Sequence, residues 1–298
     1  MAERVLVIGE NGQLGQSLRK VAADYPAFEL EFIGHPQIDL ADSQSLAAFM
    51  GANPQGWTAI INAAAYTAVD KAETEQTQAD CVNHLAVRQL AGYARQQNIF
   101  LLHVSTDYVF DGCAYRPWRE DDPVAPLNQY GVSKLAGEQA MQAAGCRGAV
   151  VRTSWLYSEF GNNFVKTMLR LGREREQLGV IADQVGTPTY ATDLAKVLFE
   201  LLQRDQTGSQ LSSVGVELYH YSNEGVASWY DFAVAIFELS GVNCLVNPIE
   251  AHAYPTPAAR PHYSVLNKAK IRQALGIQIP HWRHSLSDCL AALDELAG

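Results

Sequence analysis

The stretch VLVIGENGQLG, residues 5–15, decides the fold. Its first four residues are apolar and have the length of a buried strand, and a turn with Gly9, Gly12 and Gly15 follows. Beyond the turn, apolar residues recur at the spacing of one helix face. Such a turn lets the backbone approach a pyrophosphate, and the helix N-terminus adds N–H donors. The stretch predicts a dinucleotide site, although its spacing is G-x-x-G-x-x-G, and an ordinary glycine turn is the alternative.

Short apolar runs alternate with helical patterns on through the first half of the chain. We expect strands near 28–33, 59–61, 99–104 and 149–151, and helices near 43–50, 71–97 and 129–144. Apolar strands that alternate with helices indicate a parallel sheet covered on both faces. The prediction is an α/β fold with a doubly wound parallel (Rossmann) sheet, whose ligand crevice lies at the carboxyl ends of the strands.

The rhythm changes after about residue 152. We expect helices near 163–176, 192–204 and 228–240, isolated strands near 180–182 and 218–221, and a proline-rich loop, 254–262, before a last helix. We interpret residues 1–155 as an NAD(P)-binding Rossmann domain. Residues 156–298 are interpreted mainly as a smaller substrate-binding lobe, with the helix near 192–204 packing back on the first domain.

Composition excludes several classes of protein. The chain has 298 residues, 48% of them hydrophobic, and a net charge of −10 without a basic run, so we expect neither disorder nor a nucleic-acid or membrane partner. The five cysteines lie at least 32 residues apart and the eight histidines show no ligand spacing, so no metal site is expected. Scattered cysteines, without a signal peptide or a spanning apolar run, predict a cytoplasmic protein.

A tyrosine and a lysine four residues apart occur in Tyr130-Gly-Val-Ser-Lys134. Residues at this spacing share a helix face. A lysine ammonium beside a phenol favours the phenolate, so we expect a lowered tyrosine pKa and a usable proton donor. A surface pair on a helix is the alternative.

Hydroxyl and carboxyl groups follow the strand expected near 99–104, in the run STDYVF at 105–110. That end of a strand faces the ligand crevice in a doubly wound sheet. The Thr106 hydroxyl can donate a hydrogen bond to a carbonyl oxygen that becomes an alkoxide. A strand end capped by Thr106 and Asp107 is the alternative.

Taken together and in this order, these motifs are more specific than any one alone. The chain resembles the extended short-chain dehydrogenase/reductases, and within them the dTDP-4-dehydrorhamnose reductase branch. The matching stretches are GENGQLG (9–15), NAAAYTAVDKAE (62–73), STDYVFDG (105–112), PLNQYGVSKLAGE (126–138), RTSWLY (152–157), GNNFVKTMLRL (161–171), DQVGTPTY (183–190) and YPTPAARPHYSVL (254–266).

The resemblance implies an enzyme that passes hydride from NADPH or NADH to C4 of dTDP-4-dehydro-L-rhamnose. The product, dTDP-L-rhamnose, is a precursor of cell-surface polysaccharide such as lipopolysaccharide O-antigen. Tyr130 would donate the proton, Lys134 would hold the nicotinamide ribose and tune Tyr130, and Thr106 with Asp107 would contact the sugar. Cofactor contacts are implied for Gly9, Gly12, Gln13, Leu14, Gly15, Asp39, Leu40, Ala65, Tyr66, Thr67 and Val104.

Two residues of the second half are candidates for the sugar nucleotide. Trp155 follows a strand, where a core role and a stacking role are equally open, and the resemblance places it on the substrate. Arg260 lies in a loop held by three prolines, and its guanidinium matches a diphosphate. A solvated loop arginine is the alternative for Arg260.

Two departures from the family pattern bear on the cofactor and the metal. The second strand ends at Ile33-Gly34-His35, with no acid before Asp39 and no arginine, so neither cofactor is strongly selected. Some relatives are Mg²⁺-dependent dimers held through glutamates, but the matching positions here carry Ser17 and Thr192. A homodimer therefore remains an expectation without a bridging metal.

Two rival functions stay open. An epimerase or dehydratase could use the same scaffold, but dehydratases place an Asp-Glu pair after the threonine, and Thr106 is followed by Asp107-Tyr108. Related folds also serve as non-catalytic regulatory subunits, which the intact Thr106, Tyr130 and Lys134 argue against.

Overall fold

The computed structural model describes residues 2–35, 37–52, 56–206 and 215–297. Its centre is a six-stranded parallel sheet in the order β10-β5-β4-β3-β1-β2. The strands are β1 (Glu3–Ile8), β2 (Phe28–Ile33), β3 (Ala59–Asn62), β4 (Phe100–Thr106), β5 (Gly148–Thr153) and β10 (Val216–His220). The predicted doubly wound α/β fold is confirmed, and the chain order reverses beside β1, where such sheets open a ligand crevice.

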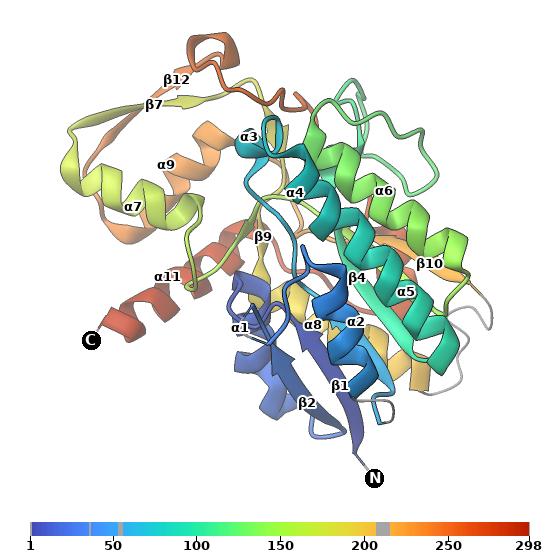
Figure 1. Cartoon of the computed structure of the whole chain (residues 1–298). Coiled ribbons are helices and arrows are strands. Elements are labelled where there is room, and N and C mark those ends of the chain that lie inside the picture. The colour runs from blue at the N-terminus through green and yellow to red at the C-terminus, as the bar shows by residue number, and fades with distance from the viewer. Residues whose placement is uncertain (1, 36, 53–55, 207–214, 298) are drawn as a thin grey trace.

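Helices cover both faces of this sheet. On one face, α1 (Gln13–Val21) and α8 (Ala191–Gln206) share a core in which Leu18 and Leu198 are fully buried. The other face carries α2 (Ser43–Ala52), α5 (Ala86–Gln97) and α6 (Gln129–Ala144) over a second core. Figure 1 shows α2, α5 and α6 side by side along the sheet.

The strand expected near 218–221 is not isolated. It forms β10, the edge of the central sheet, and pairs with β5 from Val216 opposite Gly148 to His220 opposite Arg152. The prediction of an isolated strand is therefore wrong, because local sequence carries no information on which distant strand is the partner.

The single helix expected over 71–97 is also wrong. The chain forms α3 (Val69–Ala72), α4 (Gln76–Asp80), a π-helical turn over Cys81–Leu85, and then α5. Apolar periodicity does not reveal one inserted residue in a helix, and π-turns of this kind are frequent at functional sites.

A smaller lobe lies beyond the carboxyl edge of the sheet, at the upper left of Figure 1. It contains α7 (Phe164–Glu174), α9 (Trp229–Ser240) and α11 (Trp282–Ala297) around a third core. Three two-stranded sheets pair β7 (Gln177–Ile181) with β12 (Leu245–Ile249), β6 (Leu156–Tyr157) with β9 (Thr189–Tyr190), and β8 (Val185–Gly186) with β11 (Ala227–Ser228). The remaining elements are α10 (Ala269–Leu275) and 3-10 turns at Ala22–Asp24, Asp107–Val109 and Ala251–Ala253.

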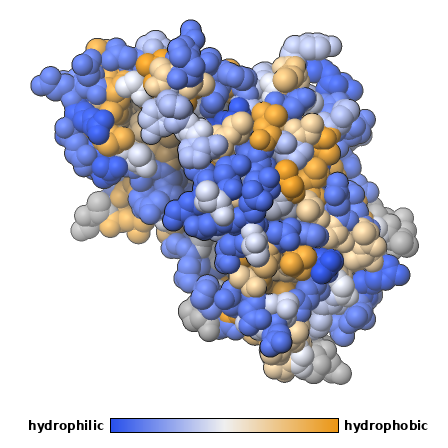
Figure 2. Space-filling model, turned by 45° about the horizontal axis from the view of Figure 1, so that its top comes forward, coloured by the Kyte–Doolittle hydropathy of each residue, from blue (hydrophilic) through white to orange (hydrophobic). Residues whose placement is uncertain are grey.

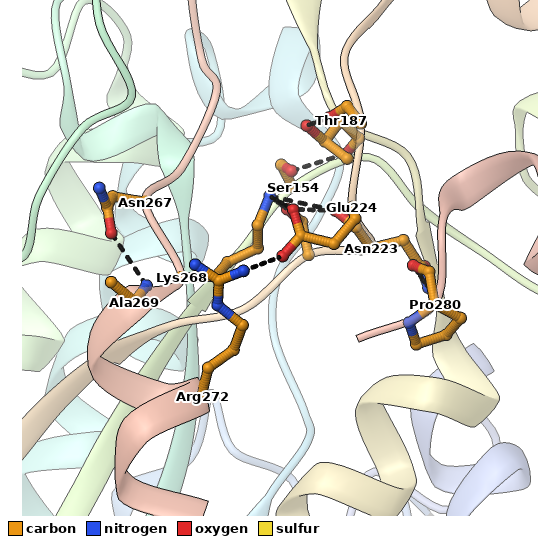
Figure 3. Close-up of polar contacts among 11 residues, drawn as sticks. Ser154, Thr187, Asn223, Glu224, Asn267, Lys268, Ala269, Arg272 and Pro280 are labelled. Atoms are coloured by element: carbon orange, nitrogen blue, oxygen red, sulfur yellow. Dashed lines mark hydrogen bonds and ion pairs between the residues drawn. The ribbon is translucent and has the colours of Figure 1, made fainter. Parts of the chain in front are cut away.

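Residues 254–267, called the strap below, run from the lobe back across the main domain. Single β-bridges join Tyr263 to Val185 and Leu266 to Trp118. Just beyond the strap, the Lys268 ammonium lies 3.2 Å from the Asn223 carbonyl oxygen and 3.5 Å from the Glu224 carboxylate. Figure 3 shows this buried lysine pointing at both groups, so the end of the strap is fastened to the segment after β10.

On the face shown in Figure 2, hydrophilic side chains predominate and apolar ones form small groups. Within the part of the chain that the structure describes, no helix combines the length and apolar character needed to cross a bilayer.

Candidate functional site

A cleft of about 730 Å³ lies at the carboxyl edge of the central sheet, a size typical of ligand sites. The segments that follow β1 to β5 all contribute to its walls, together with Trp229. Most of the predicted site residues line it: Gly9, Gly12, Gln13, Leu14, Ala65, Thr67, Val104, Thr106, Asp107, Tyr130, Lys134 and Trp155. Five do not: Gly15, Asp39, Leu40, Tyr66 and Arg260.

The glycine turn is shaped by close backbone approach. Gly9 has φ of +102°, and a Cβ there would lie 2.8 Å from the Ala64 nitrogen. A Cβ on Gly15 would lie 2.2 Å from the Gly9 carbonyl oxygen, so Gly15 shapes the turn from behind the cleft. Gly12 caps α1 without any side-chain hydrogen bond. The first N–H groups of α1 are thus left for an anion, and this fits a dinucleotide pyrophosphate.

The Gln13 side chain joins the two halves of the molecule. Its carboxamide oxygen accepts hydrogen bonds from the Ser158 hydroxyl at 3.0 Å and the Asn163 amide at 2.9 Å. Because these bonds hold the side chain, the backbone is the part of Gln13 that stays available to a cofactor.

The three predicted catalytic residues meet in the cleft. Asn128 caps α6 by accepting a hydrogen bond from the Gly131 nitrogen at 2.8 Å, which places Tyr130 in the first turn and Lys134 one turn later. The Lys134 ammonium is 2.6 Å from the Val104 carbonyl oxygen at the end of β4. Thr106 closes that strand and hydrogen bonds with Tyr130.

Burial shifts the pKa of each ionisable group here. It raises the pKa of Tyr130 to about 12, so the expectation of a lowered phenol pKa is wrong. Burial lowers the pKa of Lys134 to about 8, against the opposing charge of Glu138. It raises the pKa of Asp107 to about 7, although the Ser264 and Thr106 hydroxyls stabilise the carboxylate. A high phenol pKa keeps Tyr130 protonated, the state that a proton donor needs.

Motif reasoning missed two residues behind Lys134. The Asn62 carboxamide oxygen accepts from the Ala64 nitrogen, and its amide lies 3.1 Å from His103 Nδ1. On the other side of the ring, His103 Nε2 lies 3.3 Å from the Lys134 nitrogen, and burial together with the Lys134 charge lowers the pKa of His103. Both residues are fully buried strand positions whose polar character was the only available signal.

A buried ion pair supports the same helix. Glu138 lies four residues after Lys134 and accepts hydrogen bonds from the Ser105 hydroxyl and from Arg152, whose Nη2 is 2.7 Å away. Glu138 and Arg152 are 2% and 3% exposed. The pair locks α6 against β4 and β5, and the spacing of Tyr130, Lys134 and Glu138 on one helix face was the signal for it.

The π-turn over Cys81–Leu85 holds the backbone of Tyr66. Asn83 in that turn accepts from the Tyr66 nitrogen at 2.9 Å, and its amide donates to the Tyr66 carbonyl oxygen and the Ser133 hydroxyl. The Tyr66 hydroxyl donates to Glu75 at 2.6 Å. The break in the helix thereby connects the loop after β3 to α6, the helix that carries Tyr130 and Lys134, while the Tyr66 ring lies at the surface beside Glu75.

Trp155 occupies a conformation that few residues adopt. Its φ is +46°, and its ring stacks on Trp229 with centroids 3.5 Å apart. A Cβ on Gly186 would lie 2.7 Å from the Trp155 ring, so this glycine makes room for it. Strained residues of this kind concentrate at functional sites. Sequence reasoning identified Trp155 but missed Trp229 and Gly186, whose roles depend on contacts between distant segments.

The Arg260 guanidinium is already paired. Its Nη1 and Nη2 atoms lie 3.0 and 2.8 Å from the two carboxylate oxygens of Asp70, and Nη1 also donates to the Ala258 carbonyl oxygen. Arg260 in turn lowers the pKa of Asp70. The pair fastens the strap to α3 beside the cleft.

The two residues that made a bridging metal doubtful in the sequence do not suit one in the structure. Ser17 and Thr192 are both buried, on α1 and α8, and offer only hydroxyls where Mg²⁺ prefers carboxylates. Over residues 2–35, 37–52, 56–206 and 215–297, no three His, Cys, Asp or Glu side chains gather as metal ligands.

Comparison with known proteins identifies the family of this chain. A family model described as the RmlD substrate binding domain matches residues 3–295. The dTDP-4-dehydrorhamnose reductase of Aggregatibacter actinomycetemcomitans is 42% identical over 295 residues, which cover 97% of this chain and 98% of that protein. The Escherichia coli K12 enzyme of the same name is 39% identical, with 94% of each chain covered.

A solved structure extends the likeness to the fold. The dTDP-4-dehydrorhamnose reductase of Bacillus anthracis str. Ames, in complex with NADP, has a TM-score of 0.90 at 35% identity and covers 98% of this chain and 100% of its own. Sequence, fold and site geometry therefore agree: the chain belongs to the dTDP-4-dehydrorhamnose reductase family.

Proposed function

We propose that this protein transfers hydride from NADPH or NADH to C4 of dTDP-4-dehydro-L-rhamnose and so forms dTDP-L-rhamnose. The observation that carries the proposal is the meeting of Thr106, Tyr130 and Lys134 in one cleft beside the glycine turn. Family membership supplies the substrate class.

The nicotinamide supplies the hydride when the cofactor is bound. Tyr130 donates its phenolic proton to the oxygen of the reduced carbonyl, and its pKa of about 12 ensures that the proton is present at neutral pH. The Thr106 hydroxyl donates to Asp107 at 3.0 Å in this structure, and it turns its proton from Asp107 to the substrate oxygen as negative charge develops there. Lys134 lies one turn after Tyr130 on α6, where the Val104 carbonyl oxygen holds it, and it carries a positive charge below pH of about 8.

The cofactor site in this proposal follows the first half of the sheet. Backbone groups of Gly9, Gly12, Gln13, Leu14 and Gly15 shape the pyrophosphate site. Asp39 and Leu40 lie toward the adenine, and Ala65, Tyr66, Thr67 and Val104 lie along the middle of the cofactor, with Tyr66 contributing backbone because its ring is committed to Glu75.

The sugar-nucleotide site in this proposal combines both regions. Thr106 and Asp107 contact the reacting sugar, and Trp155 contributes a ring face next to Trp229. Arg260 holds the diphosphate by exchanging the Asp70 carboxylate for phosphate, which presents the same bidentate acceptor geometry.

One assay tests the function and its two rivals. The protein is supplied with dTDP-4-dehydro-L-rhamnose and NADPH or NADH, and the absorbance of the reduced nicotinamide is followed. Steady loss with substrate supports the reductase. Tightly held NAD⁺ that does not exchange supports an epimerase or dehydratase, and binding without turnover of any kind supports a regulatory subunit.

Three further properties complete the proposal. Residues 1–155 hold the cofactor, and residues 156–298 mainly hold the nucleotide sugar while α8 packs back on α1. The protein works in the cytoplasm as a homodimer without a bridging metal. Light scattering with and without a chelator measures the oligomeric state, and cell fractionation measures the location.

A further inference from the structure

An acidic side chain that does not belong to β2 lies at the end of this strand. Rossmann sites that prefer NADH place an acid at the end of the second strand, and here that position is Gly34. A Cβ built on Gly34 would lie 3.0 Å from the Glu10 carboxylate oxygen Oε1. Glu10 comes from the glycine turn, and its backbone nitrogen bonds to the Ile33 carbonyl oxygen at 3.1 Å. The Glu10 side chain, together with Asn11 Nδ2 at 3.0 Å, therefore lies where a side chain on residue 34 would begin.

A cation accompanies this carboxylate. The Arg19 Nη2 atom is 3.1 Å from Glu10 Oε2, and the guanidinium lies 4.0 Å above the ring centroid of Phe32 in β2. Arg19 belongs to the last turn of α1, and its side chain is 54% exposed, against 18% for Glu10. The Phe32 ring thus covers one face of the Arg19 guanidinium, while the edge of the guanidinium stays accessible to solvent and to an anion.

Glu10 stands in the chain between the cleft residues Gly9 and Asn11 and packs against Gly34, and Arg19 reaches Glu10 from outside the cleft lining. The cleft wall there includes Asn11, Gly34 and His35. In this fold the ribose 2′ position of the adenosine lies at the end of the second strand, where an acid accepts the 2′-hydroxyl of NADH and an arginine accommodates the 2′-phosphate of NADPH. The structure provides one of each, paired to each other.

We propose that Glu10 and Arg19 form a two-sided selector that sets the ratio of NADH to NADPH binding. With NADH, Glu10 accepts the 2′-hydroxyl while its bond to Arg19 persists. With NADPH, Arg19 leaves Glu10 and binds the 2′-phosphate, which repels the freed carboxylate. Each cofactor gains one charge-assisted contact and neither is excluded, so the wild-type protein binds both with Kd values within about tenfold of each other.

The inference rests on the proposed function only for the presence of a nicotinamide dinucleotide in the cleft. Its test is therefore direct binding, without sugar substrate. Purified protein is titrated with NADPH and with NADH, the fluorescence of the reduced nicotinamide is followed, and the Kd ratio is compared among variants.

Three variants separate the two halves of the selector. Glu10→Gln keeps the shape, removes the repelling charge and frees Arg19, so preference moves toward NADPH by about tenfold. Arg19→Gln removes the phosphate partner and leaves Glu10 uncompensated, so preference moves toward NADH by about tenfold. The double variant returns the ratio to within about threefold of wild type, because both opposing charges are gone.

A matched ion pair far from the cleft provides the control. Arg170 and Glu174 lie 3.1 Å apart on α7, with side chains that are 60% and 53% exposed. Arg170→Gln and Glu174→Gln make the same charge changes, and we expect both to leave the Kd ratio within twofold. Melting temperatures of all variants check that the fold is intact.

The outcomes are distinct. Opposite shifts for Glu10→Gln and Arg19→Gln, with unchanged controls, support the selector. Shifts in the same direction, or both ratios within twofold of wild type, overturn it. If the ratios shift as expected but no sugar nucleotide is reduced, the proposed function fails while the selector stands. If the wild-type protein binds neither cofactor, both fail.

Discussion

Two regions that flank the same cleft are held in different ways. The catalytic edge, residues 104–108 and 130–134, is positioned by backbone: a strand end, a capped helix, and a lysine bonded to the Val104 carbonyl oxygen. The strap has two backbone β-bridges near its end, but its middle, residues 258–260, is positioned by side chains. Asp70 holds Arg260 across 190 residues of sequence, and the Asn128 amide holds the Ala259 carbonyl oxygen across 131.

This difference decides how much of each region can be predicted from the sequence. At the catalytic edge, a spacing of four residues already places Tyr130 and Lys134 on one helix face. In the strap, the presence of Arg260 in the sequence does not reveal its role, because a guanidinium pairs equally well with a diphosphate and with the carboxylate of Asp70. The role of the strap can therefore be assigned only when the groups that its side chains contact are known.

The largest effect should come from the catalytic edge. Tyr130→Phe removes only the phenolic oxygen, and the ring still packs edge-on against Tyr108 with centroids 5.7 Å apart. We expect kcat to fall by about 10²–10⁴-fold, the usual contribution of a positioned proton donor. The Kd of NADPH should stay near its wild-type value. A variant that keeps more than about a third of the wild-type kcat would reject Tyr130 as the donor.

Tyr108→Phe is the matched control for this substitution, since it deletes a hydroxyl from the neighbouring ring in the same cleft. We expect a loss of less than about tenfold in kcat, because no proton has to come from Tyr108. Equal losses in the two variants would point to general disturbance of the cleft.

The strap should show a smaller effect, mainly in substrate affinity. If Arg260 exchanges Asp70 for the diphosphate, Arg260→Ala raises the sugar-nucleotide KM by about tenfold or more, with little change in the cofactor KM. Asp70→Asn distinguishes a clamp from a structural tie. A clamp freed from Asp70 should bind substrate as well as the wild type or better. If the pair only holds the strap in place, Asp70→Asn and Arg260→Ala should raise the sugar-nucleotide KM equally.

An unchanged sugar-nucleotide KM in Arg260→Ala, within twofold of wild type, would remove the arginine from the substrate site. The strap would then resemble the Lys268 cluster beyond it, in which a buried ammonium only fastens chain segments together.

The same contrast explains what the sequence could predict. The parallel sheet, the glycine turn and the catalytic trio follow from local periodicity and spacing, and these predictions of fold and family are confirmed. The partner of β10, the π-turn with Asn83, and Trp229 under Trp155 depend on contacts between distant segments. The direction of the Tyr130 pKa shift also escaped prediction, because the burial that raises it is a property of the whole cleft.

The pH dependence of turnover should report the catalytic edge. Burial lowers the pKa of Lys134 to about 8, the charge of Glu138 acts in the opposite direction, and the lysine nitrogen lies 3.3 Å from His103 Nε2. If the lysine acts as a cation, kcat/KM should fall as pH rises through about 8, by about tenfold per unit at the limit. A profile that stays flat from pH of about 7 to 10 would show that the charge on Lys134 is not used.

The smallest effect should appear where the two regions touch. Asp107 belongs to the catalytic edge, and Ser264 of the strap contributes a hydrogen bond to it, while burial raises the pKa of the carboxyl to about 7. A raised pKa means that the folded protein holds a proton which the unfolded chain releases above its ordinary pKa near 4. The resulting stability is fully present below that value and is lost as pH rises through about 7.

Asp107→Asn removes the ionisation altogether. The melting temperature of the wild type relative to this variant should therefore fall by a few degrees between pH of about 5 and 8. A difference that stays constant over this range would mean that Asp107 is ionised throughout, and hence that the strap covers the catalytic edge less tightly than the pairing with Ser264 implies.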